Sequence, residues 1–315
     1  MPDALRPGWT RRLSSFPDHY AQHDLAAMVV SNPVNLRYLT GFTGSAGLLV
    51  CAAAGTWLVT DGRYEAAVRQ AVAAGAMAPL QVERVDRRYD LTLADLLRRL
   101  GVRRVGFDAG HVTVAVLDGW RKAAESAVDW VSTEGVVERM RLVKDAYEIA
   151  VFRRAGPALA EVARQLGQWV RAGRTEIAVA RDIDAGIERA GFSQPAFETI
   201  VASGPNSAHP HARPGERRLA AGDLVVLDFG GVLDGYCVDL TRMAGIGQVG
   251  SEALALVEGV RAAYGAALET IRAGVTGAEV DRAARQVLDA RGLGPAFLHG
   301  TTAAATRSPT TGKAR

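Results

Sequence analysis

The sequence predicts two domains of different fold class, an α/β domain followed by an α+β domain. A chain of 315 residues is long for a single hydrophobic core, so two domains are the natural expectation. Residues 25–135 alternate short apolar runs with helical stretches, which is typical of an α/β domain. In the second half, a β-hairpin pattern at residues 224–243 lies between pairs of predicted helices.

The expected elements of the first domain follow one another closely. We predict strands at residues 25–30, 48–51, 57–60, 82–85, 104–107 and 129–131. We predict helices at residues 64–74, 91–100 and 114–124. The glycine-rich segment 41–47 is not followed by Gly-Lys-Ser/Thr, so we interpret it as turns and tight packing rather than as a nucleotide-binding loop.

A polar, arginine-rich connection at residues 136–144 marks the expected domain boundary. We therefore predict domains at residues 1–137 and 138–300, and a separate tail at 301–315. Glycines and a threonine cap delimit the elements of the second domain. These elements are helices at about 145–170, 175–190, 251–272 and 277–291, and a strand at 197–202.

Composition and charge argue against several classes of function. The pI is about 9.0, but the formal net charge of +3 equals the charge of residues 301–315 alone, so we expect no nucleic-acid binding. We also expect no membrane association, since no apolar run approaches the ~20 residues that span a bilayer. The N-terminus lacks the apolar core of a secretory signal. Cys51 and Cys237 lie in apolar runs without metal-ligand spacing, which favours buried free thiols in a reducing, cytoplasmic environment.

The hairpin carries an aspartate on each strand. With Asp234-Gly235 as the turn, Asp228 should face Thr241 and lie diagonal to Asp239 on the same face. Two half-buried carboxylates cannot both stay ionised without a cation between them, so the pair indicates a divalent metal such as Mn²⁺, Co²⁺ or Zn²⁺. The alternative is that one aspartate caps a turn and the other pairs with Arg242.

The loop before the hairpin carries His209 and His211. Most loop histidines are surface residues without a special role. This loop, however, leads directly into the strand of Asp228, which places an imidazole at the rim of the carboxylate site. Histidine titrates near neutrality, so it can transfer a proton or donate to a developing oxyanion.

At this point the sequence resembles a known family. The segments GPNSAHPHARPGERRL and LVVLDFGGVLDGYCVDLTRM resemble the metal-site half of the creatinase, aminopeptidase P, prolidase and methionine aminopeptidase family, which has the pita-bread fold. NPVNLRYLTGFTGSAGLLV and TDGRYEAA resemble the creatinase-type N-terminal domain, and ERMRLVKDAYEIAVFRRA resembles the linker and first catalytic helix. The resemblance covers roughly residues 25–300 and is closest to the Xaa-Pro peptidases.

The resemblance implies a role for individual residues. Asp228 would bind one ion of a dinuclear metal centre, and Asp239 would bridge both ions. His211 would contact the substrate and stabilise the reacting carbonyl, and His299 matches a second substrate-contacting histidine. His209 stands at a position that is usually apolar in the family, so it receives no role. The implied activity is metal-dependent hydrolysis of the bond before proline in a peptide, carried out by a homodimer.

The resemblance ends after residue 301. The family continues with Gly-His-Gly, whose histidine binds metal, and two later stretches each supply a metal-binding glutamate; here Ala303 takes the histidine position and neither glutamate follows. Residues 301–315 contain no acid, Leu, Ile, Val or aromatic residue, so we expect disorder and interpret the tail as out-of-frame or prematurely stopped sequence. A genuine divergent tail is the alternative. We expect an incomplete pita-bread domain, weak metal binding and little peptidase activity.

Three other functions remain open at this stage. A creatinase-like C–N hydrolase would use the same fold on a small non-peptide substrate. A metal-free binding module of the same fold is the second, although the retention of Asp228, Asp239 and His211 argues against it. The third is the nonfunctional product of a damaged gene.

Overall fold

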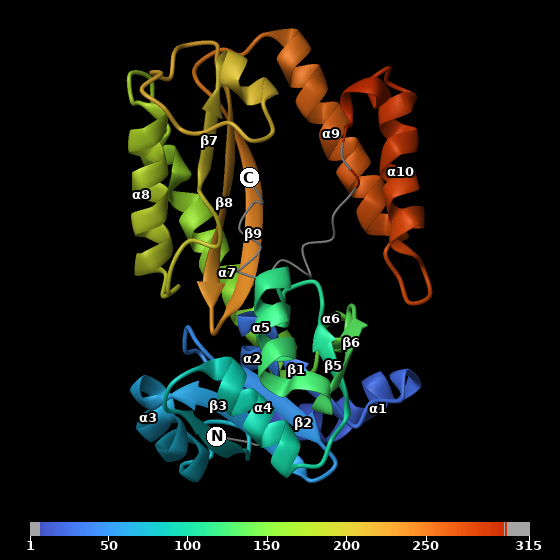
Figure 1. The fold of residues 1–315 in the computed structure, drawn as a ribbon. Helices are drawn as coiled ribbons and strands as arrows, with labels where there is room; N and C mark the ends of the chain where they lie inside the picture. Colours follow the sequence, from blue (N-terminus) through green and yellow to red (C-terminus); the bar gives the residue numbers. More distant parts are fainter. Residues whose placement is uncertain (1–6, 299, 301–315) are drawn as a thin grey trace. The chain divides into compact units, whose positions relative to one another are not determined.

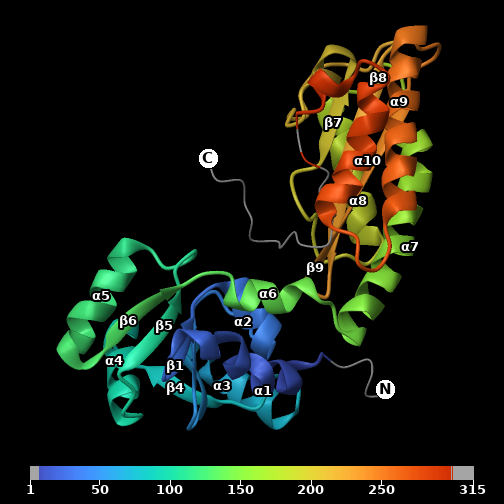
Figure 2. The same ribbon diagram turned by 90° about the vertical axis from the view of Figure 1, so that its right-hand side faces the viewer.

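The structure, a computed structural model, describes residues 7–298 and 300. The chain divides into two compact units, with the division between Ala150 and Val151 (Figure 1, Figure 2). Each unit has its own hydrophobic cores. In the part of the chain described, no helix is both long and apolar enough to cross a membrane.

A six-stranded sheet forms the centre of the first unit, in the order β4-β3-β2-β1-β5-β6. Its strands are β1 (Ala27–Val30), β2 (Leu48–Ala52), β3 (Gly55–Asp61), β4 (Gln81–Val85), β5 (Arg104–Asp108) and β6 (Asp129–Thr133). Only β2 runs antiparallel to its neighbours. The β2–β3 pair is the predicted hairpin, and the strand–helix alternation confirms the predicted α/β class.

Helices cover both faces of this sheet and produce two hydrophobic cores. They are α1 (Trp9–Tyr20), α2 (Pro33–Thr40), α3 (Gly62–Ala73), α4 (Tyr89–Arg99), α5 (Val114–Ala124) and α6 (Val136–Leu142). The central strand β1 is buried throughout: Met28 and Val30 belong to one core, and Ala27 and Val29 belong to the other. Because both faces of the sheet are covered by helices, a central strand must be apolar at every position, as β1 is.

The predicted polar connection at residues 136–144 is partly helical, which corrects the sequence analysis. Helix α6 forms there because Val136, Val137 and Met140 bury one side in the core shared with α1 and α2. Glu138 and Arg139, between these buried residues, are exposed, and such charged residues are why composition alone indicated a linker.

The second unit contains a three-stranded antiparallel sheet in the order β7-β8-β9. Its strands are β7 (Ile200–Ser203), β8 (Leu224–Leu233) and β9 (Tyr236–Gly245). Two helices, α7 (Ala146–Trp169) and α8 (Glu176–Arg189), cover one face of this sheet (Figure 1). Val225, Leu227 and Phe229 point into that core and are fully buried. The strand predicted at 197–202 begins later, at Ile200, and Thr199 instead donates its hydroxyl to Asp184.

The last two helices pack on each other. They are α9 (Ser251–Thr270) and α10 (Gly277–Asp289), and Ala263, Ala267, Ala284 and Leu288 form their small common core. The start of α10 has a complete capping box between Thr276 and Glu279.

Candidate metal centre and histidine loop

The β8–β9 hairpin has the predicted register. Asp228 is paired with Thr241, and Gly230 is paired with Asp239. Both central turn residues have positive φ, 49° at Asp234 and 83° at Gly235, as a two-residue hairpin turn of this type requires. Because paired residues and residues two apart on one strand share a face, Asp228 and Asp239 are diagonal neighbours on the same face. That face is opposite to the one covered by α7 and α8, since the alternating residues Leu227 and Phe229 belong to that core.

Both aspartates are half-buried, and their surroundings differ. The Thr241 hydroxyl donates to Asp228 Oδ1 at 3.0 Å. Burial raises the pKa of the Cys237 thiol to about 11, and the nearby charge of Asp239 acts in the same direction. Arg242 is paired with Leu227 and therefore belongs to the other face; its guanidinium donates to the carbonyl oxygen of Thr241 at 2.8 Å. The Thr241 hydroxyl and the Cys237 thiol share the face of the two carboxylates.

The histidine loop, residues 203–217, connects β7 to the segment before β8. It starts with the short 3-10 helix η4 (Gly204–Ala208) and turns through hydrogen bonds from His209 N to Asn206 O (3.0 Å) and from Ala212 N to His209 O (3.1 Å). His209 and His211 are both exposed. The contact of His211 with a substrate therefore stays a prediction.

The loop ends in an ion pair that sequence reasoning missed. Arg217 donates to both carboxylate oxygens of Asp223, at 2.6 and 2.9 Å, and this contact holds the pKa of Asp223 below its usual range. The pair lies against Gly204, whose φ is +49° and where a Cβ would meet Asp223 Oδ1 at 2.5 Å. A second missed residue is Glu176, a fully buried carboxylate whose partners lie in the same loop.

The described residues by themselves do not complete a dinuclear metal centre. Across residues 7–298 and 300, no group of three or more His, Cys, Asp or Glu side chains is placed to hold a metal ion. Catalytic ions normally have three protein ligands, and here the hairpin offers two carboxylates. His299 and the tail from residue 301, including Ala303, lie outside the described residues, so their predicted roles are not addressed by the structure.

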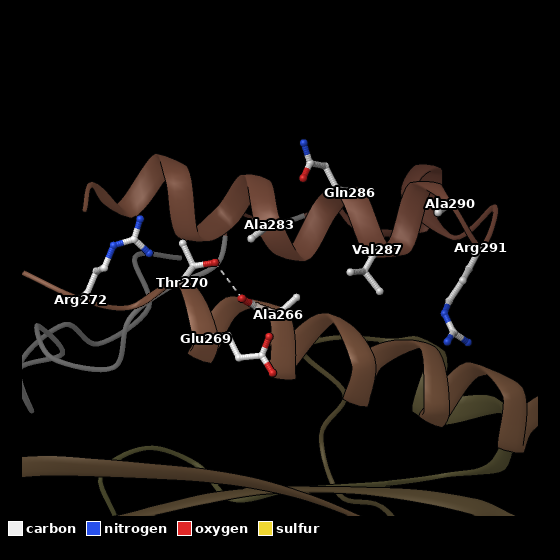
Figure 3. Close-up of a pocket in the computed structure, with 9 residues that line it drawn as sticks. All are labelled: Ala266, Glu269, Thr270, Arg272, Ala283, Gln286, Val287, Ala290 and Arg291. Atoms are coloured by element: carbon white, nitrogen blue, oxygen red, sulfur yellow. Dashed lines mark hydrogen bonds between the residues drawn. The ribbon is translucent and has the colours of Figure 1, made fainter. Parts of the chain in front are cut away.

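A cavity of about 530 Å³ lies elsewhere in the second unit, between α9 and α10 (Figure 3). Its polar lining includes Glu269, Arg272 and Arg291, while the Thr270 hydroxyl is engaged within its own helix by the carbonyl of Ala266 (2.8 Å). Asp228, Asp239 and His211 do not line this cavity. It is therefore separate from the candidate metal centre.

Comparison with known proteins gives the family. The family model of metallopeptidase family M24 matches residues 150–304, and that of the creatinase/prolidase N-terminal domain matches residues 12–143. The uncharacterized peptidase YqhT of Bacillus subtilis (strain 168) is 31% identical over 295 residues, which are 92% of this chain and 80% of that protein. The chain belongs to metallopeptidase family M24.

Two further similar proteins, both named as dipeptidases, agree with this assignment. The probable dipeptidase PepE of Mycobacterium tuberculosis (strain ATCC 25618 / H37Rv) is 35% identical over 306 residues, covering 93% of this chain and 78% of that protein. The solved structure of an Xaa-Pro dipeptidase from Bacillus anthracis superposes with a TM-score of 0.85 at 26% identity, covering 95% of this chain and 86% of that one. The predicted fold, a creatinase-type domain followed by a pita-bread domain, is confirmed. M24 membership supports a peptidase of a generally divalent-metal-dependent family.

Proposed function

We propose that this M24 peptidase cleaves the bond before proline, in the manner of an aminopeptidase P or a prolidase. In this proposal Asp228 and Asp239 would be ligands of a divalent-metal centre, dinuclear by resemblance to the family, which would supply Lewis-acid chemistry, and His211 donates a hydrogen bond to the oxyanion that develops on the substrate carbonyl. A second substrate contact by His299 and a homodimeric state belong to the same proposal and rest on the family resemblance.

The hairpin register carries the proposal. It brings Asp228 and Asp239 to one face as diagonal neighbours, a relation with a typical separation of about 7–8 Å, within which two carboxylates can share a cation. Neither aspartate contributes to the core beneath the sheet, because the core side is occupied by alternate residues such as Leu227 and Phe229. A divalent ion would offset the repulsion between the two half-buried charges. The similar protein from Bacillus anthracis is an Xaa-Pro dipeptidase, and this likeness supports the substrate class.

We further infer that the described part of the chain holds divalent ions weakly and hydrolyses peptides poorly. Two carboxylates fall short of the three protein ligands of a typical catalytic site. The role of His211 does not depend on this shortage, because a hydrogen bond to an oxyanion requires only an imidazole N–H at the substrate.

Metal titration of the purified chain tests this function. We expect weak binding of Mn²⁺, Co²⁺ or Zn²⁺ by isothermal titration calorimetry, and at least about tenfold weaker binding after Asp228→Asn or Asp239→Asn, since a lost ligand should cost no less than a lost outer-shell partner. Asp234→Asn is the matched control. It lies in the same hairpin, its carboxylate pairs with Arg154, and asparagine tolerates its positive φ.

The outcomes separate the parts of the proposal. Unchanged binding in Asp228→Asn and Asp239→Asn would contradict the metal role of the hairpin. Tight binding of two ions per chain together with rapid hydrolysis of the dipeptide Ala-Pro would instead refute the inference of weak binding, while supporting the substrate class.

A further inference from the structure

We propose that Glu176 is a positioning residue for His211, because its buried carboxylate clamps both ends of the histidine loop. The inference rests on the role proposed for His211 above. It assigns Glu176 to the function of the site, although Glu176 itself lies in a helix on the opposite side of the sheet from the hairpin aspartates.

Glu176 occupies an unusual position for a charged residue. It is the first residue of α8 and is 0% exposed. A carboxylate is rarely buried unless its oxygens are paired with donors, since an unpaired charge away from water is strongly unfavourable. The hydrogen-bond partners of Glu176 therefore indicate its structural role.

All the hydrogen-bond donors that reach the Glu176 side chain come from the histidine loop in the part of the chain described. At the entrance of the loop, Glu176 Oε1 accepts from Ser203 N (2.8 Å) and from the Ser203 hydroxyl (2.7 Å). The Asn206 amide donates to both oxygens, at 3.0 and 3.1 Å. At the exit of the loop, Glu176 Oε2 accepts from Gly215 N at 3.3 Å. Hydrogen bonds to an ionised acceptor are the strong kind, so one side chain joins the two ends.

Backbone contacts extend the clamp on the exit side. Ile177 N donates to Gly215 O and Glu176 N donates to Arg217 O, both at 3.0 Å. Arg217 then links back to the entrance, because its guanidinium donates to the Ser203 hydroxyl as well as to Asp223. The stretch between the two held ends, residues 207–214, carries both His209 and His211. The position of the exposed His211 therefore depends on loop ends that are both held by one buried carboxylate.

Helix capping does not explain Glu176. The hydroxyl of Thr175 caps α8 by accepting from Ala178 N at 3.2 Å. Glu279 shows the contrasting case: in α10 it completes a capping box with Thr276 and engages no distant loop in the hydrogen bonds of the described residues. The two glutamates lie in first helical turns of the same unit, so Glu279 is a natural control for Glu176.

Hydrogen–deuterium exchange of the full chain tests the clamp. Glu176→Gln replaces one acceptor oxygen with an NH₂ group, which then faces a donor of the loop. We expect peptides within residues 204–216 to exchange at least about tenfold faster, the effect of losing one charge-assisted hydrogen bond. Peptides of residues 181–189 and 226–245 should keep their rates, and Glu279→Gln should leave the loop unchanged.

The NMR signal of the His211 imidazole distinguishes a positioning role of Glu176 from a general effect on stability. The imidazole resonance of His211, identified by its loss in His211→Gln, should shift or broaden in Glu176→Gln. The resonances of His23 and His111, which lie in the first unit, should stay in place. If Glu176→Gln fails to fold, Asn206→Ala removes only the entrance amide and should accelerate loop exchange in the same direction.

Two results would overturn the proposal. One is wild-type exchange in the loop of a folded Glu176→Gln or Asn206→Ala variant. The other is a parallel rise in all peptides of the second unit, which would make Glu176 a stabilising residue without a specific link to His211. Neither readout requires metal binding or hydrolysis, so the peptidase proposal can fail while the clamp is upheld.

Discussion

The side-chain pair Arg217–Asp223 shows how one neighbouring cation can control the pKa of a carboxyl group at the end of the histidine loop. Asp223 is buried, and it accepts from Arg217 and from Ala220 N (2.8 Å). The hydrogen bond from Arg217 is the main cause that lowers the pKa of Asp223, and burial acts in the opposite direction. The same contact raises the pKa of Arg217.

This pair predicts a pH-dependent contribution to stability. The folded pKa of Asp223 lies below the unfolded value of about 3.9, so its stabilisation is complete above pH ~4 and is lost as the pH falls through the folded pKa. Asp223→Asn should therefore lower Tm most at pH 6–7, and the gap to the wild type should shrink below pH ~4. Asp118→Asn, in an exposed pair with Arg121, is the control. A gap that is constant from pH 7 to pH 3 would contradict this account.

At the residue scale, the sequence revealed positions that local rules determine. The Asp-Gly turn fixed the register of the hairpin, so the facing of Asp228 and Thr241 could be predicted before the structure. Glu176 could not be recognised, because a glutamate in a first helical turn also fits an ordinary helix-dipole role. Its burial depends on Ser203, Asn206 and Gly215, which are 27 to 39 residues away.

At the scale of elements, the strands of the first unit and most of the helices with a clear apolar pattern were predictable from the sequence. The wrong or missing predictions have specific causes. Helix α1 contains Pro17, which ordinarily argues against a helix interior. Helix α2 begins at Pro33 and has eight residues. A segment of this length is too short for a helical period to be recognised in the sequence. The first and last residues of β7 are set by its pairing with β8, a contact that lies outside the segment itself.

The hairpin should be intolerant of a side chain at Gly230, the residue opposite Asp239. A Cβ there would lie 2.3 Å from the backbone oxygen of Val238, which cannot move without disturbing β9. We expect Gly230→Ala to lower the free energy of unfolding by about 1–3 kcal/mol, the usual cost of overpacking, in urea denaturation. Gly277→Ala is the control, because nothing among the described residues lies within 4 Å of its added Cβ and its φ is not positive. Equal midpoints for the two variants would show that the hairpin adapts at this position.

At the scale of the whole molecule, a buried cluster decides which residues belong to the first unit. Arg12 is 4% exposed and contacts Asp145 (2.7 Å) and Glu148 (3.3 Å), while its third donor reaches Tyr38 O at 2.8 Å. The two compact units divide after Ala150, so Arg12 and both carboxylates belong to the same unit. Sequence patterns could not reveal this, since Arg12 and Asp145 are 133 residues apart.

The cluster predicts that substitution of Arg12 lowers the free energy of unfolding strongly and that the effect is confined to the first unit. Arg12→Met in the full chain leaves the buried Glu148 without its cation and leaves Asp145 only the exposed Arg11, and breaking a buried pair of this kind typically costs about 3–5 kcal/mol. Exchange should accelerate in peptides of β1 and β5 and stay unchanged in β8 and β9, because the two units have separate cores. Arg98→Met breaks only the exposed pair with Asp95 and should cost about 0–1 kcal/mol. Equally faster hydrogen exchange in peptides of both units would contradict this prediction. It would mean that the two cores unfold cooperatively, so that the division after Ala150 does not separate two independently stable units.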